Sequence, residues 1–195
     1  VLTNKKIINK NVQNEARIIR YQLLTDFCKK KKIKTILTAH NLEDQVETFF
    51  IRLSRGSGLQ GLSSMKPINK IANNIDLVRP LLDIKKKQLI IISKTIFGKF
   101  YKDPTNKNTK YLRTRIRNLK NSLEQSGINY NQISQSIRNL ASSRDTLNHY
   151  FNQIYKDTVR KEKDKVFINQ KNFNDINQEM KIGVLKKAIK DFTKN

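Results

Sequence analysis

The sequence has few of the residues that build disulfide-rich and zinc-binding proteins. It contains one cysteine, Cys28, and two histidines, His40 and His149. A single cysteine excludes a disulfide framework within one chain and a CxxC site, and two histidines make a zinc site unfavourable. No apolar run approaches the length of a membrane span, and no signal-peptide pattern is present. These absences favour a reducing, cytoplasmic setting and no membrane partner.

Acidic residues are also scarce, with 16 Asp and Glu against 40 Lys and Arg, a net charge of +24. Such an excess predicts a polyanionic partner, most simply nucleic acid. The chain is rich in Lys, Asn and Ile, whose codons are A/T-rich, so genome composition could supply part of the lysine surplus. We therefore give more weight to arginine, whose planar fork binds phosphate bidentately. Eight of the 11 arginines lie at or before position 117: Arg17, Arg20, Arg52, Arg55, Arg79, Arg113, Arg115 and Arg117.

The spacing of apolar residues predicts a series of alternating helices and strands. Helices are predicted over 15–31, from Leu42 to a stop at Gly56, over 85–97, from Thr109, over 129–162 and over 177–192. Extended segments are predicted over 1–8, 33–40 and 75–82, with a strand or loop over 165–169. Residues 57–75 have loop-like composition, and 101–108 form a turn cluster. The pattern predicts an α/β domain with a parallel sheet over 1–122 and a mainly helical domain over 123–195.

The stretch LTAHNLEDQVETFFIRLSRGSGLQGL, residues 37–62, combines an imidazole, several carboxylates and a basic glycine-rich turn. His40 ends a predicted strand, and ligands of parallel α/β folds bind beyond the carboxyl ends of strands. Asp44 lies one helical turn further on, and Glu47 and Thr48 continue the same face. We assign function to Asp44 with His40, although an ordinary polar role for His40 stays open. Glu43 is assigned only to the helix start, where the helix dipole favours a carboxylate.

Two further segments have both a structural and a functional interpretation. GSGLQG (56–61) spells GxGxxG but follows a helix, so it is not a dinucleotide fingerprint. It is either a helix cap with a linker or a loop that brings N–H groups near phosphate, beside Arg52 and Arg55. Arg113 and Arg117 share one helical face, which suits either a phosphate backbone or solvent.

Four segments together resemble the tRNA(Ile)-lysidine synthases of the PP-loop, or N-type ATP pyrophosphatase, superfamily. They are NEARIIRYQLL (14–24), the stretch 37–62, LVRPLL (77–82) and DPTNKNTKYLRTRIR (103–117). The resemblance implies a PP-loop α/β fold and an ATP-dependent ligase. In that reaction ATP adenylates the C2 carbonyl oxygen of the wobble cytidine of a CAU-anticodon tRNA(Ile). The ε-amine of free L-lysine then displaces AMP, giving lysidine.

The resemblance also implies roles for individual residues. Catalytic residues are Asp44, Arg17 and Arg113, with Asp44 as a ligand of the Mg²⁺ that accompanies ATP. ATP-binding residues are Thr38, Ala39, His40, Gly56 and Gly58, and tRNA-binding residues are Arg52, Arg55, Arg79 and Arg117. A homodimer is a further expectation.

The sequence departs from the family pattern at several positions. Asn41 stands where the family often has a second histidine, Glu43 where it has Asp, and Thr114 where Asn is common. The phosphate-binding string SGGxDS occurs nowhere. We therefore expect an internal or split piece of the enzyme that is inactive alone. The alternatives are a non-catalytic basic RNA-binding remnant and another PP-loop tRNA-modifying enzyme.

Overall fold

The computed structural model describes residues 12–101, 109–163 and 165–193, which form two compact units. Unit 1 comprises Val1–Gly56 and Ser64–Ser134, and unit 2 comprises Ser57–Ser63 and Gln135–Asn195. The extended segment predicted over 1–8 lies outside the described residues, as does almost all of the turn predicted over 101–108. The predicted domain limits at 122 and 123 stay a prediction.

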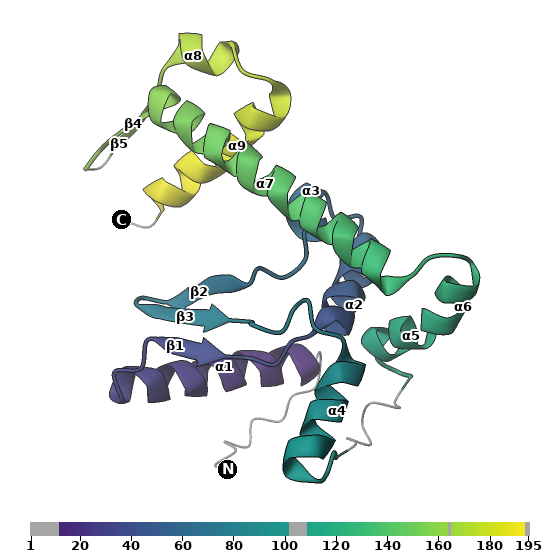
Figure 1. The fold of residues 1–195 in the computed structure, drawn as a ribbon. Helices are drawn as coiled ribbons and strands as arrows, with labels where there is room; N and C mark the ends of the chain where they lie inside the picture. Colours follow the sequence, from purple (N-terminus) through teal and green to yellow (C-terminus); the bar gives the residue numbers. More distant parts are fainter. Residues whose placement is uncertain (1–11, 102–108, 164, 194–195) are drawn as a thin grey trace. The chain divides into compact units, whose positions relative to one another are not determined.

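Unit 1 is an α/β unit whose elements follow the predicted alternation (Figure 1). In chain order they are α1 (Val12–Lys30), β1 (Thr35–Leu37), α2 (Leu42–Leu53), β2 (Ile68–Ala72), β3 (Ile75–Val78), α4 (Lys86–Phe97), α5 (Leu112–Asn118), α6 (Lys120–Gln125) and the start of α7 (Tyr130–Thr158). The predicted helices over 15–31, from Leu42, and over 85–97 are confirmed. The predicted basic helix after Thr109 begins three residues later, at Leu112.

The sheet of unit 1 has three strands in the order β1-β3-β2. β1 and β3 are parallel, with Ile36 opposite Leu77, which confirms the parallel pair that the sequence predicts. β2 runs antiparallel to β3, so the sheet is mixed rather than purely parallel. The predicted loop over 57–75 is therefore wrong for 68–72. Asn74 at φ +62° allows the tight turn of a β2–β3 hairpin, as asparagine tolerates the left-handed region.

The α1 helix packs on the sheet with a face other than its most apolar one. Cys28 joins Ile36, Ile75 and Leu77 in a buried cluster, and Tyr21 packs against it. The predicted apolar stripe of α1 is instead exposed: Ile19 43%, Leu23 56% and Phe27 55%. Periodicity identified the helix correctly, but it did not identify the face that meets the sheet.

The α2 helix buries the first part of its predicted apolar stripe. Leu42 is 5% exposed and Val46 is fully buried, while Leu53 at the other end is 47% exposed. The helix ends at Leu53, earlier than the predicted stop. Gly56 has a φ of +65°, and its N–H donates to the Leu53 carbonyl at 2.9 Å, so it serves the turn that follows.

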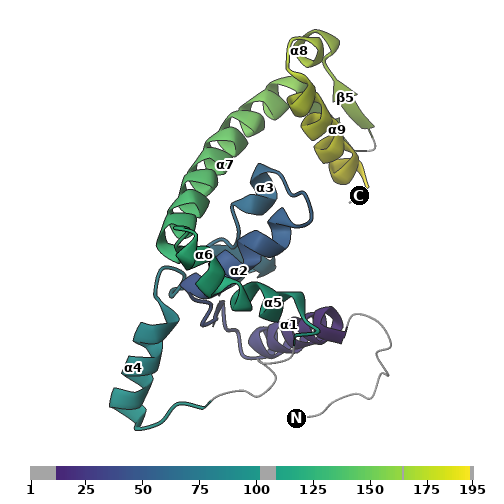
Figure 2. The ribbon, with the colours of Figure 1, turned by 90° about the vertical axis from the view of Figure 1, so that its right-hand side faces the viewer.

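Unit 2 is mainly helical, as expected, but it also contains a hairpin. Its elements are α3 (Leu59–Leu62), most of α7, β4 (Val159–Glu162), β5 (Lys165–Ile168), α8 (Gln170–Asn174) and α9 (Gln178–Phe192). The long predicted helix over 129–162 ends at Thr158, and β4 follows it and pairs with β5. Figure 2 shows this end of the chain from a second side.

The core of unit 2 lies between α7, α9 and the hairpin. Its buried members are Tyr155, Val159, Val184 and Ala188. A Cβ added at Gly183 would meet the Phe151 ring at 2.8 Å, so glycine permits the close approach of α9 to α7. Within the described ranges of both units, no helix is both long and apolar enough to cross a bilayer.

Candidate active site

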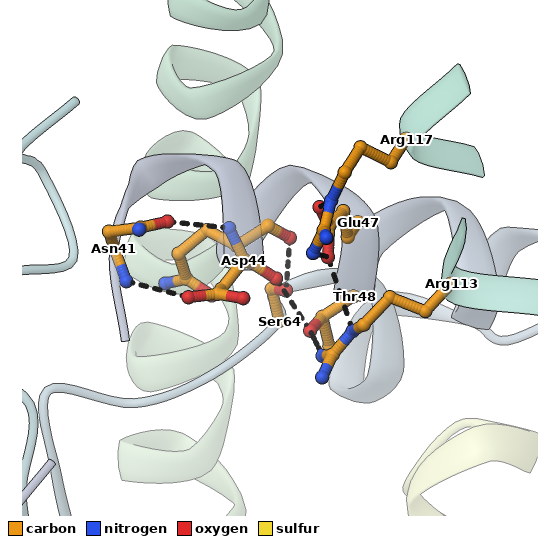
Figure 3. A network of polar contacts seen from close by, with 8 residues as sticks. Asn41, Asp44, Glu47, Thr48, Ser64, Arg113 and Arg117 are labelled. Atoms are coloured by element: carbon orange, nitrogen blue, oxygen red, sulfur yellow. Dashed lines mark hydrogen bonds and ion pairs between the residues drawn. The ribbon is translucent and has the colours of Figure 1, made fainter. Parts of the chain in front are cut away.

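The polar cluster of unit 1 begins where α2 starts, just beyond the carboxyl end of β1 (Figure 3). Asn41 is the N-cap: its Oδ1 accepts from the Asp44 N–H at 3.1 Å, and Asp44 Oδ2 accepts from the Asn41 N–H at 3.1 Å. This reciprocal capping box holds the Asp44 carboxylate in a fixed place. The departure at Asn41 therefore supplies a good cap in place of an imidazole. Within the described part of the chain, Asp44 Oδ1 accepts no hydrogen bond.

Glu47 is the residue that sequence reasoning missed. It is 1% exposed and lies between two arginines of α5, which packs beside α2. Arg117 Nε and Nη2 donate to its two oxygens at 2.7 and 3.1 Å, and Arg113 Nε lies 3.2 Å from Oε2. Burial raises the pKa of Glu47, and hydrogen bonds and charge from Arg117 offset part of that effect. The signal in the sequence was a carboxylate on the α2 face opposite two arginines spaced i, i+4.

The shared helical face of Arg113 and Arg117 is confirmed, but that face meets Glu47. Thr48 extends the network, since its hydroxyl donates to the Asp44 carbonyl at 2.7 Å and accepts from Arg113 Nη2 at 3.3 Å. Asp44, Thr48, Arg113 and Glu47 thus form one connected cluster. The bidentate pair with Glu47 argues for a structural role of Arg117, and its predicted contact with tRNA stays a prediction.

His40 lies in the same region, and its pKa is affected by charged residues of α1, α2 and α5 and by Arg79, which follows β3. A hydrogen bond of 2.9 Å joins its Nδ1 to the Thr38 hydroxyl. Burial lowers the pKa of His40 below 6.5, Asp44 raises it, and Arg79, Arg113 and Arg17 lower it further. The charges that shift the pKa of His40 thus include those of the three predicted catalytic residues, Asp44, Arg113 and Arg17. The lowered pKa favours the uncharged ring at neutral pH.

We expect the His40 ring to titrate below pH 6.5, followed by its ring proton signals in NMR. Asp44→Asn should lower the pKa of His40 further, because it removes the charge that favours the imidazolium. Arg113→Gln should raise it. Because the pKa is depressed in the folded state, the contribution of His40 to stability is fully present above pH 6.5 and is lost as the pH falls through the folded value. Shifts of the opposite sign would contradict the convergence of these residues on His40.

The remaining predicted residues have varied surroundings. Arg79 is 7% exposed and its Nη1 donates to the Lys66 carbonyl at 2.7 Å, which argues against a direct contact with tRNA. Arg52 donates to the Ser64 carbonyl at 2.9 Å and is half-buried, whereas Arg55 is exposed. Arg17 is exposed and lies over the Tyr21 ring at 5.6 Å.

The predicted ATP-binding residues are divided between the two units. Thr38 and Ala39 lie with His40 between β1 and α2, and Ala39 is exposed. Gly56 belongs to unit 1, whereas Gly58 belongs to unit 2, where it precedes the single turn of α3. The predicted loop over 57–75 is also wrong for 59–62, where α3 forms. A phosphate-binding role for the two glycines stays a prediction.

The chemistry of the site suits Mg²⁺ carried with a nucleotide better than an ion held by protein alone. Among the described residues, no cluster of three or more His, Cys, Asp and Glu side chains could hold a metal. Mg²⁺ commonly takes one or two carboxylates, with water and substrate phosphates completing its shell. Asp44, with one carboxylate oxygen accepting no hydrogen bond from a described residue, fits that pattern.

The first part of the chain matches a family of known proteins. The PP-loop domain family matches residues 2–123, and the chain belongs to that family. A solved structure, the U34-tRNA thiolase NcsA from Methanococcus maripaludis, aligns with a TM-score of 0.54 at 19% identity. It covers 70% of this chain and 46% of its own, and it supports the PP-loop fold alone.

Several curated relatives carry the name tRNA(Ile)-lysidine synthase. That of Wolbachia pipientis wMel is 37% identical over 155 residues, 80% of this chain and 36% of the relative. That of Orientia tsutsugamushi is 43% identical over 118 residues, covering 60% and 26%. That of Ruegeria pomeroyi is 31% identical over 170 residues, covering 87% and 40%. The chain thus spans about a third of the length of the relatives it matches.

Proposed function

We propose that this chain forms part of a tRNA(Ile)-lysidine synthase. The enzyme uses ATP to adenylate the C2 carbonyl oxygen of the wobble cytidine of a CAU-anticodon tRNA(Ile). The ε-amine of L-lysine then bonds to C2 and displaces AMP. The names of the relatives and the PP-loop family favour this ligase over a non-catalytic RNA-binding remnant. The observation that carries the proposal is the cluster of Asp44, Thr48, Arg113 and Glu47 beside the start of α2, in a chain of the PP-loop family.

Asp44 is the carboxylate that we assign to the proposed reaction. Glu47 is buried between two arginines, so its charge is already balanced within the protein. Asp44 is half-buried, and its carboxylate keeps an oxygen that accepts no hydrogen bond from a described residue. It is therefore placed to accept a cation, either the Mg²⁺ of the nucleotide or the ammonium group of lysine. When bound, ATP supplies the adenylyl group that activates the cytidine.

The arginines supply the complementary charge. Arg113 is anchored by Glu47 and Thr48, yet its side chain is 40% exposed, so it can still reach a phosphate. Arg17, from α1, is exposed and so can also contact a ligand. Positive groups held rigidly before the reaction stabilise charge that develops on phosphate oxygens in the transition state. A neutral His40 adds a hydrogen-bonding group without adding charge.

The tRNA contact is proposed at Arg52 and Arg55, near the end of α2, with an overall electrostatic contribution from the net charge of +24. We expect the affinity for tRNA to fall steeply with salt. Each phosphate neutralised should contribute about −0.7 to −0.9 to the slope of log affinity against log salt. Fluorescence anisotropy with labelled tRNA between low and moderate salt measures this slope. Arg55→Gln should reduce its magnitude, and a flat salt response would contradict the electrostatic proposal.

The proposed function is tested with the full-length protein, ATP, Mg²⁺, labelled L-lysine and a CAU-anticodon tRNA(Ile). Lysine should become covalently attached to the tRNA with release of one AMP for each lysine. A matched tRNA with a uridine at the wobble position is the control, because it lacks the cytidine that accepts lysine. Transfer of sulfur, or AMP release without lysine attachment, would indicate another PP-loop tRNA-modifying enzyme. A cytoplasmic location and a homodimer stay predictions.

A further inference from the structure

One cavity of unit 1 lies beside the candidate active site and has a different lining. It has a volume of about 460 Å³ and lies among α2, α4, α5, α6 and the start of α7. It shares Glu47 and Arg117 with the ion-pair cluster, but Asp44 and His40 are not part of its lining. Its volume falls within the range of small-molecule sites, which is roughly 300–1,000 Å³.

The lining carries an excess of positive charge. Five cations (Lys86, Lys87, Lys94, Arg117 and Lys120) face two carboxylates, Glu43 and Glu47. Both carboxylates already have partners, since Glu43 accepts from the Lys86 N–H at 2.8 Å and Glu47 binds the two arginines. The structure thus presents lysine ammonium groups to a ligand, which favours an anion such as a phosphate and disfavours a cationic ligand such as free lysine.

A buried tyrosine supplies an independent indication of a ligand. Tyr130 lines the cavity and is 5% exposed, and its hydroxyl has no hydrogen-bond partner among the described residues. An unpaired buried hydroxyl costs stability unless a ligand or water satisfies it. Burial, with smaller contributions from Glu47 and Glu43, raises the pKa of Tyr130 to about 12, so the group is a hydrogen-bond donor at neutral pH.

One wall of the cavity is apolar. Ile90 and Ile91 of α4 line it, and Ile91 is 55% exposed although it belongs to a cavity wall. An apolar wall, a single directed hydroxyl and a basic rim match the parts of one nucleotide, namely the base, a polar atom on its edge and the phosphate. Unpaired nucleotides of RNA present these parts together, because their bases are free to leave the stack.

We propose that this cavity binds a nucleoside phosphate, as an unpaired nucleotide of the RNA substrate. The base lies against Ile90 and Ile91, the Tyr130 hydroxyl donates to a base acceptor, and Lys94 and Lys120 bind the phosphate. The proposal rests on the proposed function only in taking RNA as the source of the nucleotide. A free mononucleotide has the same chemistry and is distinguished by the experiment.

The test uses Tyr130→Phe in the full-length protein, because this change removes the hydroxyl and keeps the packing of the ring. The probes are a single-stranded RNA heptamer, followed by fluorescence anisotropy, and cytidine 5′-monophosphate and L-lysine, followed by calorimetry. Tyr130→Phe should lower the affinity for the heptamer about three- to tenfold, the effect of one hydrogen bond, and leave the melting temperature of the protein unchanged or higher. Lys94→Gln should lower the affinity for the heptamer by a similar factor. Lys70→Gln, an exposed lysine of β2 outside the cavity, is the charge-matched control and should have a smaller effect.

The outcomes separate the possible ligands. If the two cavity variants lose affinity for the heptamer but not for cytidine 5′-monophosphate, the ligand is a nucleotide within RNA. If they lose affinity for both probes to a similar extent, the cavity has the same chemistry but takes a free nucleotide. Heptamer binding that is unchanged in both Tyr130→Phe and Lys94→Gln overturns the proposal. Binding of L-lysine in the cavity, in place of the nucleotide probes, also overturns it. Heptamer binding does not depend on lysine attachment to tRNA. The cavity proposal and the proposed function can therefore fail separately.

Discussion

Replacement of Asp44 by Asn is expected to lower the rate of lysidine formation on the order of a hundredfold or more, with little change in stability. The Asn side chain is nearly isosteric, and its amide oxygen can still accept the Asn41 N–H that now meets Oδ2. Asp44 is the N3 residue of the capping box, a position at which an amide side chain serves as well as a carboxylate. The capping box thus survives in outline, while the negative charge available to Mg²⁺ or to the lysine ammonium is lost. The measurement is modified tRNA formed per unit time, alongside a melting curve.

Asp26→Asn is the matched control, because Asp26 is an exposed acid of α1 that has no place in the proposed site. It should leave both the rate and the melting temperature essentially unchanged. The capping box gives Asp44 a structural role in its own right, so the comparison of rate with stability decides between the two roles. Equal, mild losses of rate at Asp44 and Asp26 would show that Asp44 only caps its helix.

Replacement of Glu47 by Gln is expected to destabilise unit 1 by about 3 kcal/mol. Glu47 is 1% exposed and balances Arg113 and Arg117, whose side chains are 40% and 32% exposed. Removing the buried partner leaves two arginines facing a neutral amide, but their partial exposure lets water compensate in part. The cost should therefore fall at the lower end of the range for broken buried pairs. Denaturant unfolding measures it, and hydrogen exchange of α2 and α5 amides locates it.

Glu124→Gln provides the comparison for that change. Glu124 pairs with Lys120 at 3.9 Å on the surface, where both side chains are well exposed. Such pairs contribute about 0.2–1 kcal/mol, so its loss should be hard to detect. Glu47→Gln should also lower lysidine formation, because Arg113 loses the carboxylate that orients it. A Glu47 variant as stable as the Glu124 variant would show that the buried ion pair does not hold α5 on α2.

The sequence by itself determined the helices and the parallel strand pair, and it predicted the region of the candidate site. Periodicity located α1, α2, α4 and α9, because each repeats apolar residues at helical spacing. The end of a short apolar strand followed by acids at a helix start predicted a site at His40 and Asp44, and Asp44 raises the pKa of His40 in the structure. Their functional roles stay predictions. These features are local, so neighbouring residues are enough to specify them.

The tertiary structure alone decided which residues meet across elements. Glu47 is separated from Arg113 and Arg117 by more than sixty positions, and only the packing of α5 on α2 buries it between them. The same packing makes Arg117 a structural partner, where a helical face alone allowed either solvent or phosphate. The α1 stripe is exposed and β2 pairs antiparallel to β3. Such outcomes depend on long-range contacts, because a helix or strand pattern specifies an element but not the surface that it meets.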